Sequence, residues 1–173
     1  MSRNYYIRIA TLSDVNILCE IGAKTFVETY GNQNTPENLQ NYLLEKFSEK
    51  QISDELSTPH TLFLLIEFDD EVIGYSKMRV NLVENPDPKA LEIERIYITK
   101  QYHGQKLGAF LMQGCIDTAI KNTYTSLWLG VWEHNPKAIA FYQKWGFEVF
   151  GTHIFQLGDD AQTDFLMKKI LSE

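Results

Sequence analysis

The chain has 173 residues, is 44% hydrophobic and carries a formal net charge of −7. This length and apolar content suit one domain with a sizeable core, and we predict a single domain over residues 1–173. The negative charge argues against a nucleic-acid-binding surface, which needs clustered lysine and arginine, and is compatible with a cationic partner. No apolar run approaches the roughly 20 residues that cross a bilayer, so we predict no membrane association.

Cysteine and histidine usage narrows the class of protein further. Cys19 and Cys115 both fall on apolar helical faces, which predicts reduced, buried thiols in a cytoplasmic protein. The four histidines are scattered and lack the paired spacing of a zinc site. We therefore expect no metal.

Hydrophobic periodicity predicts strands and helices that alternate along the chain. In the first half we expect a strand over 5–10, a helix over 15–30 capped by Ser13 and Asp14, helices over 36–47 and 48–56, and a hairpin of strands over 61–68 and 72–83. In the second half we expect strands over 91–98, 126–132, 147–155 and 164–171, with helices over 107–120 and 136–145. Strands joined by helical crossovers indicate an α/β fold with a mixed sheet that is partly parallel at its centre.

Two segments of the second half carry the functional information. The first is the β-branched and aromatic run Leu91–Ile98, followed by a glycine-containing turn and by an apolar helical stripe that begins at Leu107. A strand, a turn and a helix N-terminus together bind phosphate, because free backbone N–H groups and the helix dipole both point at the anion. The spacing matches neither a Walker A loop nor a GxGxxG turn.

The second segment is Asn135–Phe147, directly after the strand expected over 126–132. Asn135 and Pro136 suit the cap and first position of a helix, and Gly146 suits the left-handed residue that ends one. Between them, apolar side chains recur at steps of three and four residues and form one helical face: Ala138, Phe141, Tyr142 and Trp145. Gly130, in the preceding strand, marks either a β-bulge or a plain packing position.

In this order, with a strand between them, the two segments resemble motifs A and B of the GCN5-related N-acetyltransferases (GNAT). The resemblance covers nearly the whole chain and implies the α/β GNAT fold, a mixed sheet of six to seven strands with splayed strands 4 and 5, flanked by about four helices. It also implies acetyl-CoA as the cofactor. Residues 25–31, 36–39, 93–98 and 128–135 further resemble PaiA-type polyamine N-acetyltransferases, which implies spermidine or spermine as the acceptor.

Motif A of that family reads Arg/Gln-x-x-Gly-x-Gly/Ala and cradles the coenzyme A pyrophosphate. Here His103 takes the first position and Lys106 the fourth, so both depart from the family's residues, while Gly108 fits the sixth. A lysine in the fourth position still presents its N–H to the anion if its φ is negative, and its ammonium can pair with a phosphate. The phosphate loop expected from this register comprises His103, Gly104, Gln105, Lys106, Leu107, Gly108 and Ala109.

The resemblance implies further cofactor contacts outside this loop. Backbone groups of Ile96, Tyr97 and Ile98 would pair with the pantetheine arm as if it were an added strand. Asn135 can hydrogen-bond the pantetheine or cap its own helix, and the two roles can alternate. Lys144 either reaches an adenosine phosphate or is simply exposed.

The implied reaction needs a neutral amine, although a free alkylamine has a pKa of about 10, and an acid beside the leaving thiolate. The resemblance places Tyr142 beside the sulfur in that second role; the alternative is a core aromatic. Glu92 and Glu94 share one face of their strand, so one of them could act as a water-relayed base. Sheltered together they would raise one another's pKa. The alternative is structural ion pairing with Lys77, Arg79 or Arg95.

The acceptor side of the cleft is expected under the first two helices. Candidate contacts for a polycation are Glu28, Tyr30, Glu37, Trp132 and Glu133, with Trp132 offering a ring face to an ammonium, although each could be an ordinary solvated residue. The leading hypothesis is acetyl transfer to a primary amine of a small cationic molecule, a polyamine first, by direct attack in a ternary complex. A peptide or protein N-acetyltransferase and a non-catalytic acyl-CoA-binding regulatory domain are the alternatives. The apolar, aromatic last strands offer an interface for a homodimer, and the oligomeric state stays open.

Overall fold

The computed structural model describes residues 4–171, so residues 1–3 and 172–173 of the predicted domain lie outside the described part. Within it, the strands are β1 (Tyr5–Ile9), β2 (Thr61–Phe68), β3 (Glu71–Arg79), β4 (Ala90–Ile98), β5 (Ser126–Trp132), β6 (Glu148–Leu157) and β7 (Asp160–Ile170). The α-helices are α1 (Val15–Tyr30), α2 (Pro36–Lys46), α3 (Glu49–Ser57), α4 (Leu107–Lys121) and α5 (Pro136–Lys144). None of the described helices combines the length and the apolar character needed to cross a membrane.

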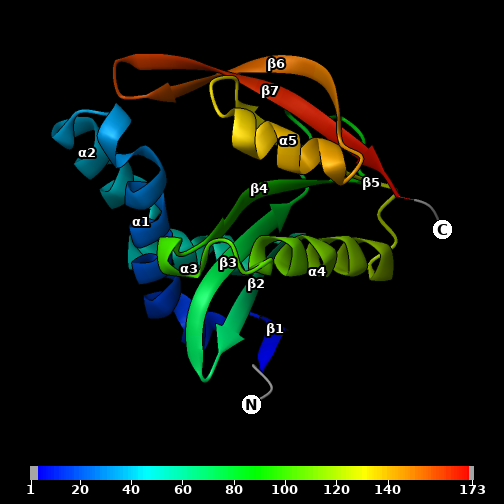
Figure 1. Cartoon of the computed structure of the whole chain (residues 1–173), viewed down its shortest axis with the longest axis horizontal. Helices are drawn as coiled ribbons and strands as arrows, with labels where there is room; N and C mark the ends of the chain where they lie inside the picture. The colour runs from blue at the N-terminus through cyan, green and yellow to red at the C-terminus, as the bar shows by residue number, and fades with distance from the viewer. Residues whose placement is uncertain (1–3, 172–173) are drawn as a thin grey trace.

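The seven described strands form one mixed sheet in the order β1-β2-β3-β4-β5-β7-β6 (Figure 1). Neighbouring strands are antiparallel except for β4 and β5, which run parallel at the centre. A parallel pair needs a crossover, and α4 supplies it between these two strands. The α/β fold class and the mixed sheet predicted above are confirmed.

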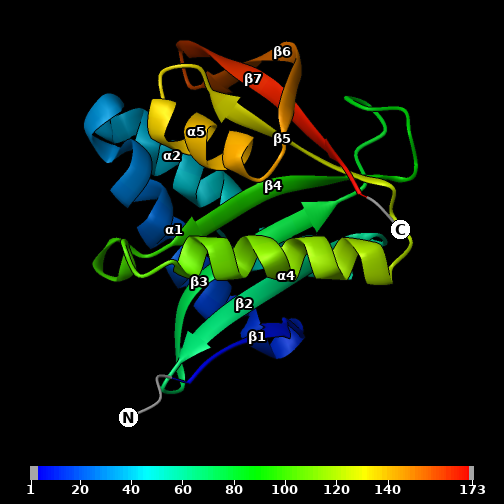
Figure 2. The same ribbon diagram turned by 45° about the vertical axis from the view of Figure 1, so that its right-hand side comes forward.

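Two layers of helices cover the sheet (Figure 2). Helices α4 and α5 pack on one face around a cluster that includes Leu91, Leu111 and Leu129. Helices α1, α2 and α3 pack on the other face around a cluster that includes Leu18, Ile52 and Leu65. Each layer buries one apolar face of the sheet, which is why the central strands read as nearly continuous hydrophobic runs.

The parallel pair β4–β5 is hydrogen-bonded over a short stretch and then opens. Ala90, Leu91 and Glu92 pair with Ser126, Leu127 and Trp128, and the described pairing ends there although both strands continue. Beyond this point the facing edges of β4 and β5 retain backbone N–H and C=O groups that no strand satisfies. The predicted splay between strands 4 and 5 is therefore confirmed, and it opens a gap through the middle of the sheet.

A β-bulge shapes the opening strand. Met78 of β3 pairs with Ile93, and Lys77 pairs with Arg95, so Glu94 stands opposite no residue of β3. By contrast, Gly130 of β5 pairs with Leu166 of β7 without any irregularity. Of the two alternatives for Gly130, the bulge is wrong, and the bulge belongs to β4 instead.

Three local expectations also need correction. Strand β3 ends at Arg79 and not at residue 83, because the segment over 80–89, which contains two prolines, leaves the sheet. Asp14 is the N-cap residue of α1, but its carboxylate accepts from the Thr11 N–H and from Arg8 and makes no hydrogen bond to the helix. Cys115 is buried as predicted, whereas Cys19 is only half-buried.

Candidate active site

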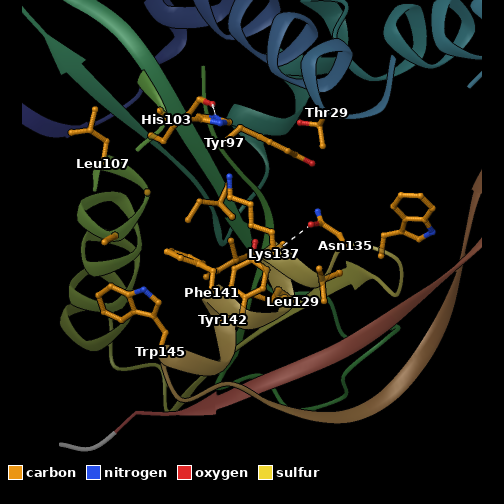
Figure 3. Close-up of a pocket in the computed structure, with 18 of the residues that line it drawn as sticks. Thr29, Tyr97, His103, Leu107, Leu129, Asn135, Lys137, Phe141, Tyr142 and Trp145 are labelled. Atoms are coloured by element: carbon orange, nitrogen blue, oxygen red, sulfur yellow. Dashed lines mark hydrogen bonds between the residues drawn. The ribbon is translucent and has the colours of Figure 1, made fainter. Parts of the chain in front are cut away.

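A cavity of about 650 Å³ occupies the gap between β4 and β5 on the side of α4 and α5 (Figure 3). The β4 edge, the turn before α4, the end of β5 and one face of α5 line it. Figure 3 shows side chains of α5, among them Phe141, Tyr142 and Trp145, opposite His103 and Tyr97. Every residue predicted to bind the cofactor lines this cavity except Gln105.

The turn before α4 presents a helix N-terminus to the cavity. The N-cap residue of α4 is Lys106, whose side chain makes no capping hydrogen bond, so the first N–H groups of the helix remain available to an anion. His103 fixes the start of the turn, because its Nε2 lies 2.7 Å from the Ile98 carbonyl oxygen and donates to it. The backbone of the turn therefore presents a helix N-terminus to the cavity, and the phosphate contact itself stays a prediction.

The condition placed on Lys106 is wrong. Its φ is +62° and its ψ is +16°, which is the left-handed region, so the expected negative φ does not occur. The family's glycine at this position adopts such a conformation at no cost, whereas a side chain strains it by about 1 kcal/mol. Lys106 thus adopts the left-handed backbone conformation of the motif's glycine, at a cost in conformational strain.

Lysines supply most of the formal charge along the walls of the first cavity. Lys106, Lys137 and Lys144 all line it, and Glu94 is the only carboxylate among its lining residues within the described chain. Lys137 was missed by the sequence analysis, although its place in the first turn of α5 was an available signal. The Asn135 side chain accepts a hydrogen bond from the Ala138 N–H at 3.1 Å and so caps α5, while its contact with the pantetheine stays a prediction.

Tyr142 lies on the cavity-facing side of α5, next to Phe141 and Phe147. Burial raises the pKa of its phenol well above the ordinary value, and Tyr30 and Cys115 add to this shift. The hydroxyl consequently keeps its proton at neutral pH and can donate it as a hydrogen bond. This state suits a group that faces a developing thiolate.

A second cavity, of about 240 Å³, lies on the opposite side of the gap, under α1 and α2. Five residues line both cavities and mark where they adjoin: Tyr30, Glu94, Tyr97, Gly130 and Trp132. The second cavity holds four carboxylates and no lysine among its described lining residues, namely Glu84, Glu92, Glu94 and Asp164. Its other walls are largely aromatic.

Both β4 glutamates in this cavity are held by cations. Arg79 Nε lies 2.8 Å from Glu92 Oε2, and Lys77 Nζ lies 2.5 Å from Glu94 Oε2. Burial alone would raise the pKa of Glu94, but Arg95, Lys77 and Arg79 outweigh it and hold the pKa below its ordinary value. The expectation that the two carboxylates raise one another's pKa is therefore wrong for Glu94, because neighbouring cations dominate.

The residues predicted to contact a polycation separate into two groups. Tyr30 and Trp132 line both cavities. Glu28, Glu37 and Glu133 line neither cavity, and the Glu28 carboxylate instead accepts a hydrogen bond from the Lys100 N–H at 2.9 Å. Asp164 was not predicted as a site residue, because no motif or residue spacing in the sequence marks it.

Comparison with known proteins identifies the class. The sequence model of the acetyltransferase (GNAT) family matches residues 24–147, and the chain belongs to this family. It is 41% identical over 153 residues to an uncharacterized N-acetyltransferase from the pepI 3′ region of Lactobacillus delbrueckii subsp. lactis, covering 87% of this chain and 88% of that protein. The predicted family membership is confirmed, and the protein is an N-acetyltransferase.

Two further relatives bear on the finer resemblance. The chain is 26% identical to a spermidine N(1)-acetyltransferase from Thermoplasma acidophilum, covering 94% of this chain and 95% of that protein. The crystal structure of the PaiA N-acetyltransferase from Thermoplasma acidophilum in complex with coenzyme A superposes with a TM-score of 0.80, at 24% identity, covering 96% of this chain and 99% of the other. The resemblance of the fold to PaiA is confirmed.

Acetyl-CoA is the cofactor of this family, and when bound it supplies an acetyl thioester. The residues present fit it, because the first cavity combines a free helix N-terminus, three lining lysines and an unpaired β4 edge. Within that cavity the turn over 103–109 would hold the pyrophosphate, and Ile96–Ile98 would hold the pantetheine arm.

Proposed function

We propose that this N-acetyltransferase acetylates a primary amine of a small cationic molecule, with the polyamines spermidine and spermine as the first candidates. The observation that carries the proposal is the second cavity, which is acidic and aromatic and adjoins the cofactor cavity at Gly130 and Trp132. Carboxylates select cations, and aromatic faces attract ammonium groups. The spermidine N(1)-acetyltransferase among its relatives supports the same class of acceptor.

In this proposal the amine attacks directly in a ternary complex, and each side chain has a defined task. Trp132 and Tyr30 line the junction of the cavities and would orient the amine between them. Tyr142 holds a proton at its hydroxyl and would deliver it, or a hydrogen bond, to the departing sulfur. Glu92 and Glu94 would line the acceptor side of the gap as ion pairs with Arg79 and Lys77, which leaves Asp164 and Glu84 as the carboxylates that no lysine or arginine neutralises.

The charge of the two cavities favours separate binding of the two substrates. The cofactor is polyanionic, and the lysines of the first cavity match its phosphates. A polyamine is polycationic and would be repelled there, whereas the second cavity carries carboxylates and two arginines that are already paired. The anionic cofactor would thus bind in the first cavity and the cationic amine in the second, on opposite sides of the sheet.

The test is the release of coenzyme A thiol from acetyl-CoA with a panel of amines: spermidine, spermine, an amino-sugar antibiotic and a short peptide. We expect turnover with the polyamines at a kcat/KM at least ten-fold above that for the peptide. Turnover confined to the peptide would reject the small-amine proposal in favour of a peptide acceptor. Tight binding of acetyl-CoA with no turnover on any amine would point to the acyl-CoA-binding regulatory domain.

A further inference from the structure

Asp164 of β7 differs from the other carboxylates of the second cavity, since Glu92 and Glu94 pair with cations and Glu84 lies 3.6 Å from His153. Within residues 4–171, neither a hydrogen bond nor an ion pair reaches its carboxylate, whereas Glu92 and Glu94 are paired with Arg79 and Lys77. Aspartate is depleted in strands, and a half-buried carboxylate without a partner is costly. Packing does not explain why an aspartate occupies this position, so a functional explanation is needed.

The position of Asp164 beside the junction of the two cavities offers a functional explanation. Its Oδ2 lies 3.3 Å from the point that a side chain at Gly130 would occupy, so the carboxylate sits directly over the bare backbone of β5. Gly130 lines both cavities and lies two residues beyond Trp128, where the pairing between β4 and β5 ends. Because Gly130 has no side chain, the carboxylate faces the β5 backbone there, and its register partner on β5 is Trp132, which lines both cavities.

Building on the proposed function, we propose that Asp164 binds the acceptor ammonium group and removes its proton before acetyl transfer. In this step an N–H bond of the ammonium breaks, an O–H bond forms on Asp164, and the amine nitrogen keeps the electron pair. The proton then passes to water at the mouth of the cavity, where Glu84 and His153 are both about 37% exposed. No other reactant is needed.

The electrostatic surroundings of Asp164 agree with this role. Burial raises the pKa of its carboxyl to about 6, and His153, its register partner on β6, lowers it. A proton acceptor is most effective when its pKa lies near the working pH. The other titratable or charged groups that line the cavity around it are Tyr30 of α1, Tyr42 of α2, Arg79 of β3, Glu84, and Glu92, Glu94, Arg95 and Tyr97 of β4.

The β4 glutamates are less suited to accept the proton. The pKa of Glu94 is held below its ordinary value, because Arg95, Lys77 and Arg79 outweigh the effect of burial. Glu92 accepts hydrogen bonds from Arg79 and Asn81, so its Oε2 is already engaged. Asp164 therefore offers a carboxylate on the same side of the gap that no hydrogen bond from the described residues engages.

The experiment compares Asp164→Asn with the wild-type protein and with Asp160→Asn, an exposed aspartate on the same strand. With spermidine, we expect kcat/KM to fall about 10²- to 10⁴-fold in Asp164→Asn only. The wild-type pH profile should have an acidic limb with a midpoint near 6, and this limb should be absent from Asp164→Asn. Wild-type activity with an unchanged limb in Asp164→Asn would overturn the proposal.

A second readout does not depend on turnover. Carbon-13 NMR of the aspartate side-chain carboxyl groups should show one signal with a midpoint near pH 6 that is missing from Asp164→Asn and present in Asp160→Asn. A midpoint for Asp164 near 4 would overturn the assignment. If wild-type protein acetylates another amine of the panel and not spermidine, the polyamine proposal fails, and the same pH profile measured with that amine tests Asp164 separately.

Discussion

The two cavities are built from different parts of the chain by different means. The first depends mainly on backbone: a helix N-terminus, an open strand edge and a turn held in shape by His103 and a left-handed residue. The second depends on side chains brought together from α1, α2, β3, β4, β5, β6 and β7. A site made of backbone tolerates changes of side chain, whereas a site made of side chains can change its specificity without changing the fold. The comparison suggests that cofactor binding and acceptor choice can be altered independently.

The largest expected effect concerns Tyr142, which lines the first cavity on α5. We expect Tyr142→Phe to lower kcat about 10²- to 10⁴-fold, because the phenol proton is lost while the ring remains. Coenzyme A affinity, measured by calorimetry, should change little. Tyr124→Phe, outside both cavities, is the matched control. Activity of Tyr142→Phe within three-fold of wild type would identify Tyr142 as a core aromatic only.

The next effect concerns the ionic support under the acceptor cavity. Glu55 of α3 is 8% exposed and pairs with Lys77 at 3.0 Å and with Arg95 at 3.1 Å. Removing its charge leaves two buried cations short of a partner, so Glu55→Gln should lower the free energy of unfolding by about 3 kcal/mol. Denaturant unfolding measures this change.

The neighbouring residue Asp54 provides the control, because its pair with Lys50 lies on the surface of the same helix. Asp54→Asn should leave the unfolding midpoint unchanged, since exposed ion pairs contribute little. In conditions where Glu55→Gln is folded, its coenzyme A affinity should equal that of the wild type, because Glu55 does not line the first cavity. A loss of coenzyme A affinity in that variant would contradict the independence of the two cavities.

A smaller effect is expected at Lys106. Glycine adopts the observed φ of +62° without strain, so Lys106→Gly should raise the free energy of unfolding by about 0.5–1 kcal/mol over Lys106→Ala. Both variants lack the ammonium, so the difference between them reports the backbone alone. Equal weakening of coenzyme A binding in both would assign a phosphate contact to the ammonium. A glycine variant less stable than the alanine variant would show that the left-handed conformation carries no strain.

The elements that build the first cavity could be predicted from the sequence better than those that build the second. The order of strands and helices, the splay of β4 and β5 and the phosphate turn all arise from short, contiguous segments with their own local signals. Asn135, Pro136 and Gly146 mark α5 and its end because caps and left-handed residues have strong preferences. Local chemistry of this kind can be recognised in one sequence without an alignment.

The acceptor cavity could not be predicted in the same way. Asp164 and Gly130 are 34 positions apart and meet because β5 and β7 pair. No local sequence pattern predicts this pairing. The bulge at Glu94 depends on the register with β3, and the sign of the Glu94 pKa shift depends on three cations from two strands. The expected negative φ of Lys106 was wrong because the turn, and not the preference of a lysine, imposes its conformation.

A comparably small effect on stability tests Asp164 most sharply, because its size depends on pH. The folded pKa of about 6 lies above the ordinary value of 3.8, so the native state binds this proton more tightly than the unfolded state does. Asp164 therefore makes wild-type stability decline as pH rises from about 4 to 6, and the loss is complete above 6. Asp164→Asn has no such proton and should avoid the loss.

Relative to wild type, Asp164→Asn should gain about 1 kcal/mol in the free energy of unfolding at pH 7.5, a value reduced to allow for solvent screening at a half-buried group. At pH 3.5 the two proteins should differ by much less, and Asp160→Asn should show no such change between the two pH values. Denaturant unfolding at both pH values gives the difference. A variant that is less stable than wild type at pH 7.5 and equal to it at pH 3.5 would mean that a cation stabilises the charged carboxylate. In that case the free carboxylate required for binding the acceptor amine would not exist.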